Sequence, residues 1–279
     1  MADQVISASG AVANIVPEVW SARYTQNLND NVAFNSLISR EYEGEIRSMG
    51  DTVNIPTIAD VDASLLTEGA RGDAQTITVS KTALVVNSRA FVDFIVTDQA
   101  SLQSLLEMDK LRELAVSALA RKMQDDIVDA IVPSASAPDH AIAYDSGTTL
   151  ADADLLEALD LEADANWSHL GGRYLVTGEK QYLDLVNTSK FYDKTLGGNS
   201  NVSQGELSGS IYGHTPGSST ACGTTTYMFH DSFMQMAVQK DLSINLYDLG
   251  GQGQRAWRLN VDVLYGIKQV FDTRVVSIG

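Results

Sequence analysis

The stretch TITVSKTALVVNSRAFVDFIV, Thr76–Val96, has the alternation and the β-branched content of a strand, but it is several times longer than an ordinary strand of about 5–6 residues. At roughly 3.3 Å per residue it would extend on the order of 70 Å, which exceeds the radius of any compact domain that this chain could form. We therefore expect part of it to project from the core.

The apolar positions of this stretch change phase along its length. They are odd at Ile77 and Val79 and even from Leu84 to Val96. A slip of one residue turns the opposite face of a strand toward the core. We therefore predict a bend or bulge near residues 83–85.

A second extended segment precedes the stretch. GDTVNIPTI, residues 50–58, is strand-like, and the polar, turn-rich residues 59–75 connect it to the long stretch. Together they predict a two-stranded arm over residues 50–97 with its tip at 59–75. The tripeptide Arg71-Gly72-Asp73 lies in this tip, and we interpret it as turn residues rather than as an adhesion motif.

Downstream, apolar residues at helical spacing predict a helix from Asp98 to Val132, about 50 Å long. Asp98 is suited to cap its start, and Pro133 is suited to end it. Its apolar stripe includes Leu111 and Leu114. We expect this stripe to pack on the closing strands of the chain, around Val261, Val263, Val270 and Val275.

Alternating elements then predict a compact α/β unit, with a helix at 152–167, a strand at 173–177 and a helix at 179–186. Residues 190–226 are rich in Gly, Ser, Thr and Asn and predict a long loop with a function. Two paired strands, AWRLNVDVLYG and QVFDTRVVSI, are expected to close the chain. The acidic residues around the leucine stripe of the first helix are interpreted as a solvated face: Asp152, Asp154, Glu157, Asp160, Glu162 and Asp164.

The composition excludes several classes of protein. A chain of 279 residues with 44% apolar content can bury one large or two smaller cores. The 36 acidic against 19 basic residues give a charge of −17, which disfavours tight binding to nucleic acids and anionic membranes. The excess of acidic residues is explained by solubility or by adaptation to a salty medium. A second interpretation is a protein surface that must not adhere to DNA.

The cysteine content and the N-terminal sequence bear on the cellular compartment of the protein. The single Cys222 excludes an intrachain disulfide framework, fits a reducing compartment and is expected to be a small buried hydrophobe. Residues 1–16 lack the basic start of a signal peptide, and no run approaches the ~20 apolar residues of a membrane span.

Enzymatic motifs are weak. Residues 251–256, GQGQRA, match a relaxed dinucleotide fingerprint with Asp272 downstream, but AWRLNVDV alternates as a strand, which favours a hairpin. His230-Asp231 has no nucleophile-elbow serine, although a triad of distant residues remains an alternative. We predict no enzyme, no cofactor and no metal site, since the four histidines have no metal-ligand spacing: His140, His169, His214 and His230.

The order of these elements resembles the α+β, Hong Kong 97-like fold of the major capsid proteins of tailed bacteriophages. The segments that carry the resemblance are IVPEVWSARYTQNLNDNVAFNSLI, GDTVNIPTI, the helix of residues 98–132, SGSIYGH and VDVLYGIKQVFDTRVVSIG. The resemblance implies an N-terminal arm at 1–49, an E-loop at 50–97, a peripheral domain with its spine helix at 98–144, an axial domain at 145–228, and a return to the peripheral domain at 229–279.

The resemblance also implies a function. The protein would assemble with itself into pentamers and hexamers of an icosahedral virion shell, formed in the host cytoplasm around double-stranded DNA that it binds without sequence specificity. Further partners would be a portal, a separate scaffolding protein and a decoration protein, with no membrane involved. The scaffolding protein would be separate because the N-terminal segment is too short for a scaffolding domain. The candidate subunit-contact residues are Arg71, Asp73, Lys81, Arg89 and Tyr212.

Two alternatives stay open. An encapsulin-like nanocompartment shares the fold and packages proteins, and a soluble enzyme would form a small oligomer with a ligand pocket. In some capsids of this fold, neighbouring subunits are covalently cross-linked by a Lys–Asn isopeptide bond. Lys81 lies in the predicted arm, but nothing in the sequence identifies a partner Asn or an assisting carboxylate, so we do not assign this bond to Lys81.

Overall fold

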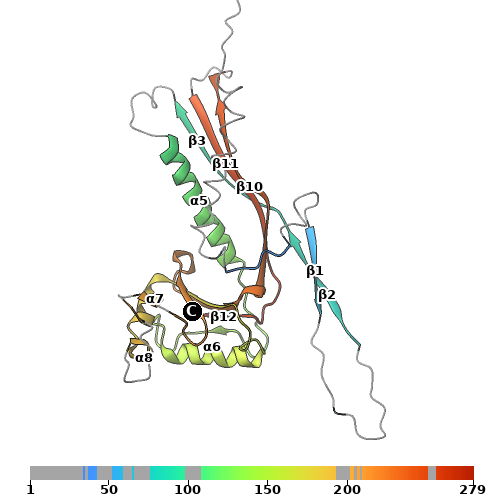
Figure 1. Ribbon diagram of the computed structural model, residues 1–279, viewed down its shortest axis with the longest axis vertical. Helices are drawn as coiled ribbons and strands as arrows, with labels where there is room; N and C mark the ends of the chain where they lie inside the picture. The colour runs from blue at the N-terminus through green and yellow to red at the C-terminus, as the bar shows by residue number, and fades with distance from the viewer. Residues whose placement is uncertain are drawn as a thin grey trace, which may run out of the picture.

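The computed structural model contains two main sheets and a projecting β-hairpin (Figure 1). The residues that the structure describes are 34, 37–42, 52–58, 65, 76–97, 108–192, 202–203, 206–207, 209–250 and 256–279.

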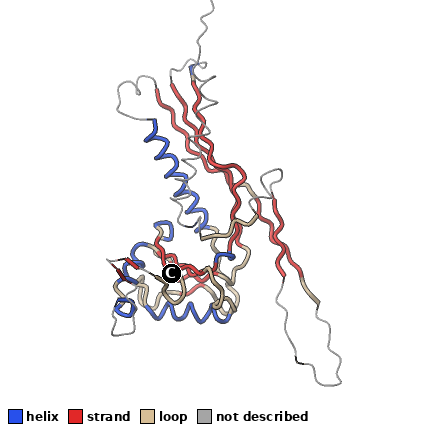
Figure 2. Tube along the Cα trace, in the orientation of Figure 1, coloured by secondary structure: helices blue, strands red, loops and turns tan. Residues whose placement is uncertain are grey.

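The first sheet, called the long sheet, has three antiparallel strands in the order β10-β11-β3. They are β10 (Met234–Asp248), β11 (Ala256–Gln269) and β3 (Ser88–Thr97). Helix α5 (Met108–Asp129) lies along one face of this sheet (Figure 2). Even-numbered residues of β3 face the helix, and they join a core that includes Ala115, Leu119, Met123, Ile127, Leu259, Val261 and Val263.

The second sheet has five strands in the order β4-β12-β9-β5-β8. They are β4 (Ala141–Ile142), β12 (Val275–Ile278), β9 (Thr226–His230), β5 (Arg173–Thr177) and β8 (Thr215–Ser218). Helix α6 (Asp152–Asp164) packs on one face, with α7 (Glu179–Val186) and α8 (Ser189–Tyr192) beside it. The core between them contains Leu155, Ala158, Trp167, Leu175, Leu185, Met228, Val276 and Ile278.

Shorter elements complete the chain. A two-stranded pair, β6 (Val202–Ser203) and β7 (Glu206–Leu207), lies before β8 in the sequence. The 3-10 turns η3 (Thr220–Cys222) and η4 (Asp231–Phe233) flank β9. Among the described helices, none is both long and apolar enough to cross a membrane.

The hairpin consists of β1 (Thr52–Ile58) and β2 (Val79–Val85), paired from Thr52↔Val85 to Ile58↔Val79. Its base is held by a small core of Ile55, Leu84, Val86 and Ala237. It extends away from both sheets (Figure 1).

The long stretch of the sequence is therefore two strands in two different sheets. The break lies at residues 86–87, just after the predicted position of 83–85, and the predicted arm of residues 50–97 was too long because 88–97 pair with β11. At this point β11 passes so close that a Cβ on Gly266 would lie 2.4 Å from the carbonyl oxygen of Val85, so only glycine fits. The predicted tip, 59–75, lies outside the described residues apart from residue 65.

The predicted long helix is confirmed over Met108–Asp129, while residues 98–107, with the proposed cap Asp98, lie outside the description. The helix ends before Val132. Three of the predicted contacts, Val261, Val263 and Val275, share its core, whereas Val270 packs beside the base of the hairpin. Leu114 is 61% exposed, so its place in the core-facing stripe was wrong.

In the α/β unit, the strand at 173–177 and the helix at 179–186 are confirmed residue for residue. The first helix ends at Asp164, and Asn166, with φ 57°, turns the chain back so that Trp167 enters the core. The expected pairing of the two closing strands was wrong. β11 pairs with β10 and β3, and β12 joins the five-stranded sheet, because the turn at 270–274 carries the chain from one sheet to the other.

Candidate assembly surfaces

The two faces of the hairpin have opposite environments. Alternate residues, such as Ile55 and Leu84, are buried against the small core at its base. The opposite face points to solvent and carries Ile58 (66% exposed), Val79 (61%) and Val85 (37%). A strand pair whose inner face is buried at its base and whose outer face exposes several apolar residues has the pattern of an interaction surface.

The face of the long sheet that points away from α5 is also partly apolar. Phe91 and Ile95 lie on this face of the edge strand β3, with Asp93 between them, and are 64% and 60% exposed. Tyr247 of β10 and Arg258 of β11 are paired in register on the same face. We call this surface the outer face.

Ion pairs separate the apolar residues of the outer face. Arg258 donates to both carboxylate oxygens of Asp93, and this hydrogen bonding lowers the pKa of Asp93. Asp262 is buried beneath Arg89 and Lys240 and accepts from both. The outer face therefore consists of exposed apolar residues between fixed charges.

Asp262 also shows how a charge is held at this surface. Burial would raise its pKa, but hydrogen bonds from Ser243, Arg89 and Lys240 outweigh burial and lower it. The strand β10 has an irregular register between Val238 and Ser243, opposite Asp262. This irregularity brings Lys240 and Ser243 to the same carboxylate.

The predicted contact residues lie on different parts of the structure. Arg71 and Asp73 are outside the described residues. Lys81 is exposed on the apolar face of the hairpin, opposite Pro56. Arg89 is half exposed on the outer face but already pairs with Asp262 in its own subunit. The structure therefore brings Lys81 and Arg89 to two separate exposed surfaces.

Tyr212 lies on the five-stranded unit. It occupies a turn between Ile211 and His214 with φ 50°, and its hydroxyl donates to Asp152 at the start of α6. Lys190 of α8 contacts both groups, and its hydrogen bonds with Tyr212 and Asp152 raise the pKa of Lys190 to about 12. Tyr212 thus fastens a surface turn to two helices.

The expected solvated acidic face of α6 was wrong for two of its six residues. Glu162 is fully buried, and its carboxylate lies 2.7 Å from Nε2 of His214 and 3.3 Å from Nη1 of Arg173. Asp154 is 1% exposed and accepts from the backbone amides of Ala151 and Asp145. Their spacing offered a signal that was missed, because both residues lie on the side of the helix that carries the apolar core positions.

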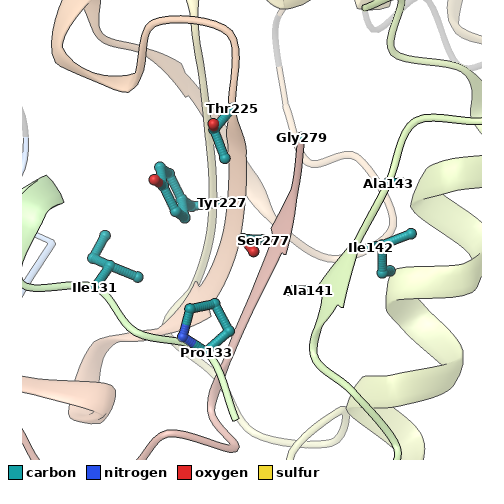
Figure 3. A pocket seen from close by; sticks show the side chains of 9 residues that line it. All are labelled: Ile131, Pro133, Ala141, Ile142, Ala143, Thr225, Tyr227, Ser277 and Gly279. Carbon is teal, nitrogen blue, oxygen red and sulfur yellow. The ribbon is translucent and has the colours of Figure 1, made fainter. Parts of the chain in front are cut away.

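A groove of about 410 Å³ opens where the segment after α5 meets the five-stranded sheet. Figure 3 shows Ile131 and Pro133 on one side and Tyr227 and Ser277 on the strands opposite. The side chains that line the groove include hydroxyl groups but no carboxylate, imidazole or amine. The ionisable side chain in this lining is the phenol of Tyr227, and burial raises its pKa.

The other candidate chemical residues have structural surroundings. Residues 251–255 of the glycine motif lie outside the description, but β10 and β11 on either side are antiparallel and Leu249 bonds to Ala256, which confirms the hairpin. Cys222 is buried as expected, and burial raises its pKa to about 12. In the described parts of the chain no three His, Cys, Asp or Glu side chains gather as metal ligands would.

No family model and no curated protein matches the chain. Solved structures do match. A structure of Mycobacterium phage Che8 has a TM-score of 0.71 and 24% identity, with 89% of this chain and 91% of that one covered. The capsid of the cyanophage P-SCSP1u has a TM-score of 0.66 and 12% identity, with 83% and 84% covered.

A third match is the crystal structure of a virus-like particle from Pyrococcus furiosus, with a TM-score of 0.62 and 12% identity over 94% of this chain and 99% of that one. Each of the three matches covers more than four fifths of the chain. The chain therefore has the same fold as these structures, the α+β, Hong Kong 97-like fold that the order of its elements predicted.

Proposed function

We propose that the protein is the major capsid protein of a tailed bacteriophage, a structural protein whose copies form the icosahedral head around double-stranded DNA. The observation that carries the proposal is the projecting hairpin with its exposed apolar face at Ile58, Val79 and Val85. The fold shared with phage capsid structures supports it.

The hairpin can act through a neighbouring copy. Its buried face is satisfied within its own subunit, whereas the opposite face would remove apolar surface from water only by packing on another chain. The outer face of the long sheet offers apolar residues at Phe91 and Ile95 for such a contact. A hairpin on one copy and a sheet on the next form a head-to-tail contact, which closes into rings such as pentamers and hexamers.

Within this proposal each part of the chain has a role. The hairpin is the E-loop, α5 is the spine helix of the peripheral domain, and the five-stranded unit is the axial domain near the centre of each ring. Lys81 lies at the hairpin contact, Arg89 at the outer face and Tyr212 on the axial surface. The partners outside the ring would be a portal, a scaffolding protein and a decoration protein, and the charge of −17 suits a wall that encloses DNA without adhering to it.

The test is assembly of the full chain, measured by sedimentation and electron microscopy. The double variant Ile58→Asp/Val79→Asp should give subunits that fold but do not form shells, because two charges would have to be buried at the contact. The matched control is Ser80→Asp, which changes the neighbouring residue on the opposite face of the same strand. Shells of the double variant that match those of the control would contradict the proposal.

A second candidate is the shell of a cellular compartment, favoured by the match to a virus-like particle from Pyrococcus furiosus. The contents of purified particles separate the two. Packaged DNA supports the phage head, and packaged protein supports the compartment. A soluble enzyme would instead sediment as a small oligomer and form no particle.

A further inference from the structure

Two short connectors join the five-stranded sheet to the long sheet. Residues 230–234 lead from β9 through η4 to β10, and residues 270–274 lead from β11 to β12. The amides of Val270 and Phe271 both donate to the carbonyl oxygen of Phe233, at 2.8 and 3.1 Å. The relative position of the two sheets therefore depends in part on this small set of hydrogen bonds.

His230 caps the turn η4 in the first connector. Its Nδ1 accepts from the backbone amide of Ser232 at 3.2 Å and lies 2.8 Å from the Ser232 hydroxyl. A backbone amide can only donate, so Nδ1 must carry no proton, and the one proton of a neutral ring is then on Nε2. The cap exists only while His230 is neutral.

A second partner lies beside the same nitrogen. Oδ1 of Asp231 is 3.0 Å from Nδ1 of His230, on a side chain that is 46% exposed. A proton on Nδ1 would face the donor amide of Ser232 unfavourably, but it could be donated to the carboxylate of Asp231. Protonation thus exchanges one hydrogen-bond partner of His230 for another.

The surroundings of His230 set the direction of this exchange. Burial has the largest effect and lowers the pKa of His230 below 6.5, and the charges of Arg274, next to β12, and Arg173, in β5, act in the same direction. Asp231 and a hydrogen bond to the backbone of Gly171 act in the opposite direction without cancelling it.

The second connector is tied to the cap. Nη1 of Arg274 donates to the hydroxyl of Ser232 at 2.6 Å, and the amide of His230 donates to the carbonyl of Arg274 at 3.2 Å. We infer that His230 is a pH-sensitive latch between the two sheets, which caps η4 and joins the connectors when neutral and turns to Asp231 when protonated. This inference concerns the single subunit and does not depend on the proposed shell.

The sign of the pH dependence follows from the lowered pKa. The protonated ring of the released form donates to Asp231, so the released form has a higher proton affinity than the capped ring, whose pKa is lowered. The latch is therefore closed while the released ring would be neutral, and protonation favours the released form as the pH falls through the pKa of the released ring. The closed form then loses about tenfold in the latch equilibrium for each pH unit, until the pKa of the capped ring is reached.

Hydrogen exchange of the full chain, read by mass spectrometry at about pH 7.5 and about pH 5 and corrected for intrinsic rates, measures this. Protection of residues 231–234 should be lower at pH 5 than at pH 7.5, by at most about tenfold per pH unit, while β5 stays protected. In His230→Asn the side-chain oxygen can cap the turn at every pH, so its protection should not change. His169→Asn, which removes an exposed histidine, should behave as the natural chain does.

An equal loss of protection in the natural chain and in His230→Asn would overturn the latch, and so would a natural chain whose protection does not change with pH. Asp231→Asn provides an independent test should His230→Asn not fold. It removes the partner of the protonated ring, so the loss of protection should move to lower pH. An unchanged midpoint in Asp231→Asn would also overturn the proposal.

Discussion

The five-stranded sheet and the long sheet differ in how completely the chain covers them. The five-stranded sheet has α6 on one face, and the main core, with Phe229 and Val275, on part of the other. The long sheet has α5 on one face only, and its outer face leaves Phe91 and Ile95 exposed (Figure 2). The five-stranded sheet is therefore largely complete within one subunit, and the long sheet is not.

Charges follow the same division. In the five-stranded unit, Glu162 and His214 are sealed in the core beside Arg173, where water and other chains have no access to them. On the outer face of the long sheet, the pair Asp93–Arg258 stays at the surface between apolar residues. A sealed charge stabilises one arrangement of one chain, whereas a surface pair can also orient a partner.

The largest expected effect is on the sealed cluster. Glu162→Gln removes the only carboxylate that the structure shows within ion-pair distance of Arg173, among the described residues, and leaves that cation without its anion. Denaturant unfolding of the subunit should show a loss of about 3–5 kcal/mol in the free energy of unfolding. Glu157→Gln, on the exposed side of the same helix, should stay within about 0.5 kcal/mol. Equal losses in the two variants would show that the cluster does not stabilise the unit.

A smaller effect separates the two faces of the long sheet. Phe94→Ala removes a ring that packs on the core and should cost about 3 kcal/mol in unfolding free energy, near the low end for buried aromatic residues. Phe91→Ala, on the outer face of the same strand, should change it by no more than about 0.5 kcal/mol. If Phe91→Ala is as damaging as Phe94→Ala, the outer face is covered within the subunit and the comparison between the sheets is wrong.

The smallest effect concerns the side of α5 that points away from the long sheet. Leu114→Ala should change the unfolding free energy by less than about 0.5 kcal/mol, because its side chain is mostly exposed and alanine favours helices. Leu119→Ala, on the buried side, should cost about 2–5 kcal/mol. A substantial cost at Leu114 would place a further part of the chain over the helix.

Local patterns predicted much of this fold. Arg173–Thr177 is a short apolar run that follows a glycine pair, and Glu179–Val186 begins directly after Gly178, so both elements have clear ends in the sequence. The change of phase after Val79 predicted a bend or bulge near residues 83–85, and the structure has a break between β2 and β3 just after that position. The order of the elements along the whole chain predicted the capsid fold.

Long-range features could not be predicted from such patterns. The apolar residues of α5 cover too wide an arc to show which side is buried, so Leu114 was placed on the wrong side. β8 has the sequence Thr-Pro-Gly-Ser, which has low strand propensity, and it forms a strand because β5 lies beside it at the sheet edge. The position of Glu162 on the helix indicates its burial, but its contact with His214 depends on a residue from a distant part of the sequence.

The pairing of β3 with β11 has a consequence for the synthesis of the protein. Asp93 and Arg258 are 165 residues apart in the chain, so a ribosome at about 5–20 residues per second makes the second roughly 10–30 s after the first. Throughout that interval β3 has no partner strand on either side, and its β-branched and aromatic residues can pair with other growing chains. An unfinished chain therefore exposes an unpaired strand edge until β11 has been made, and contact between such chains during this interval favours aggregation.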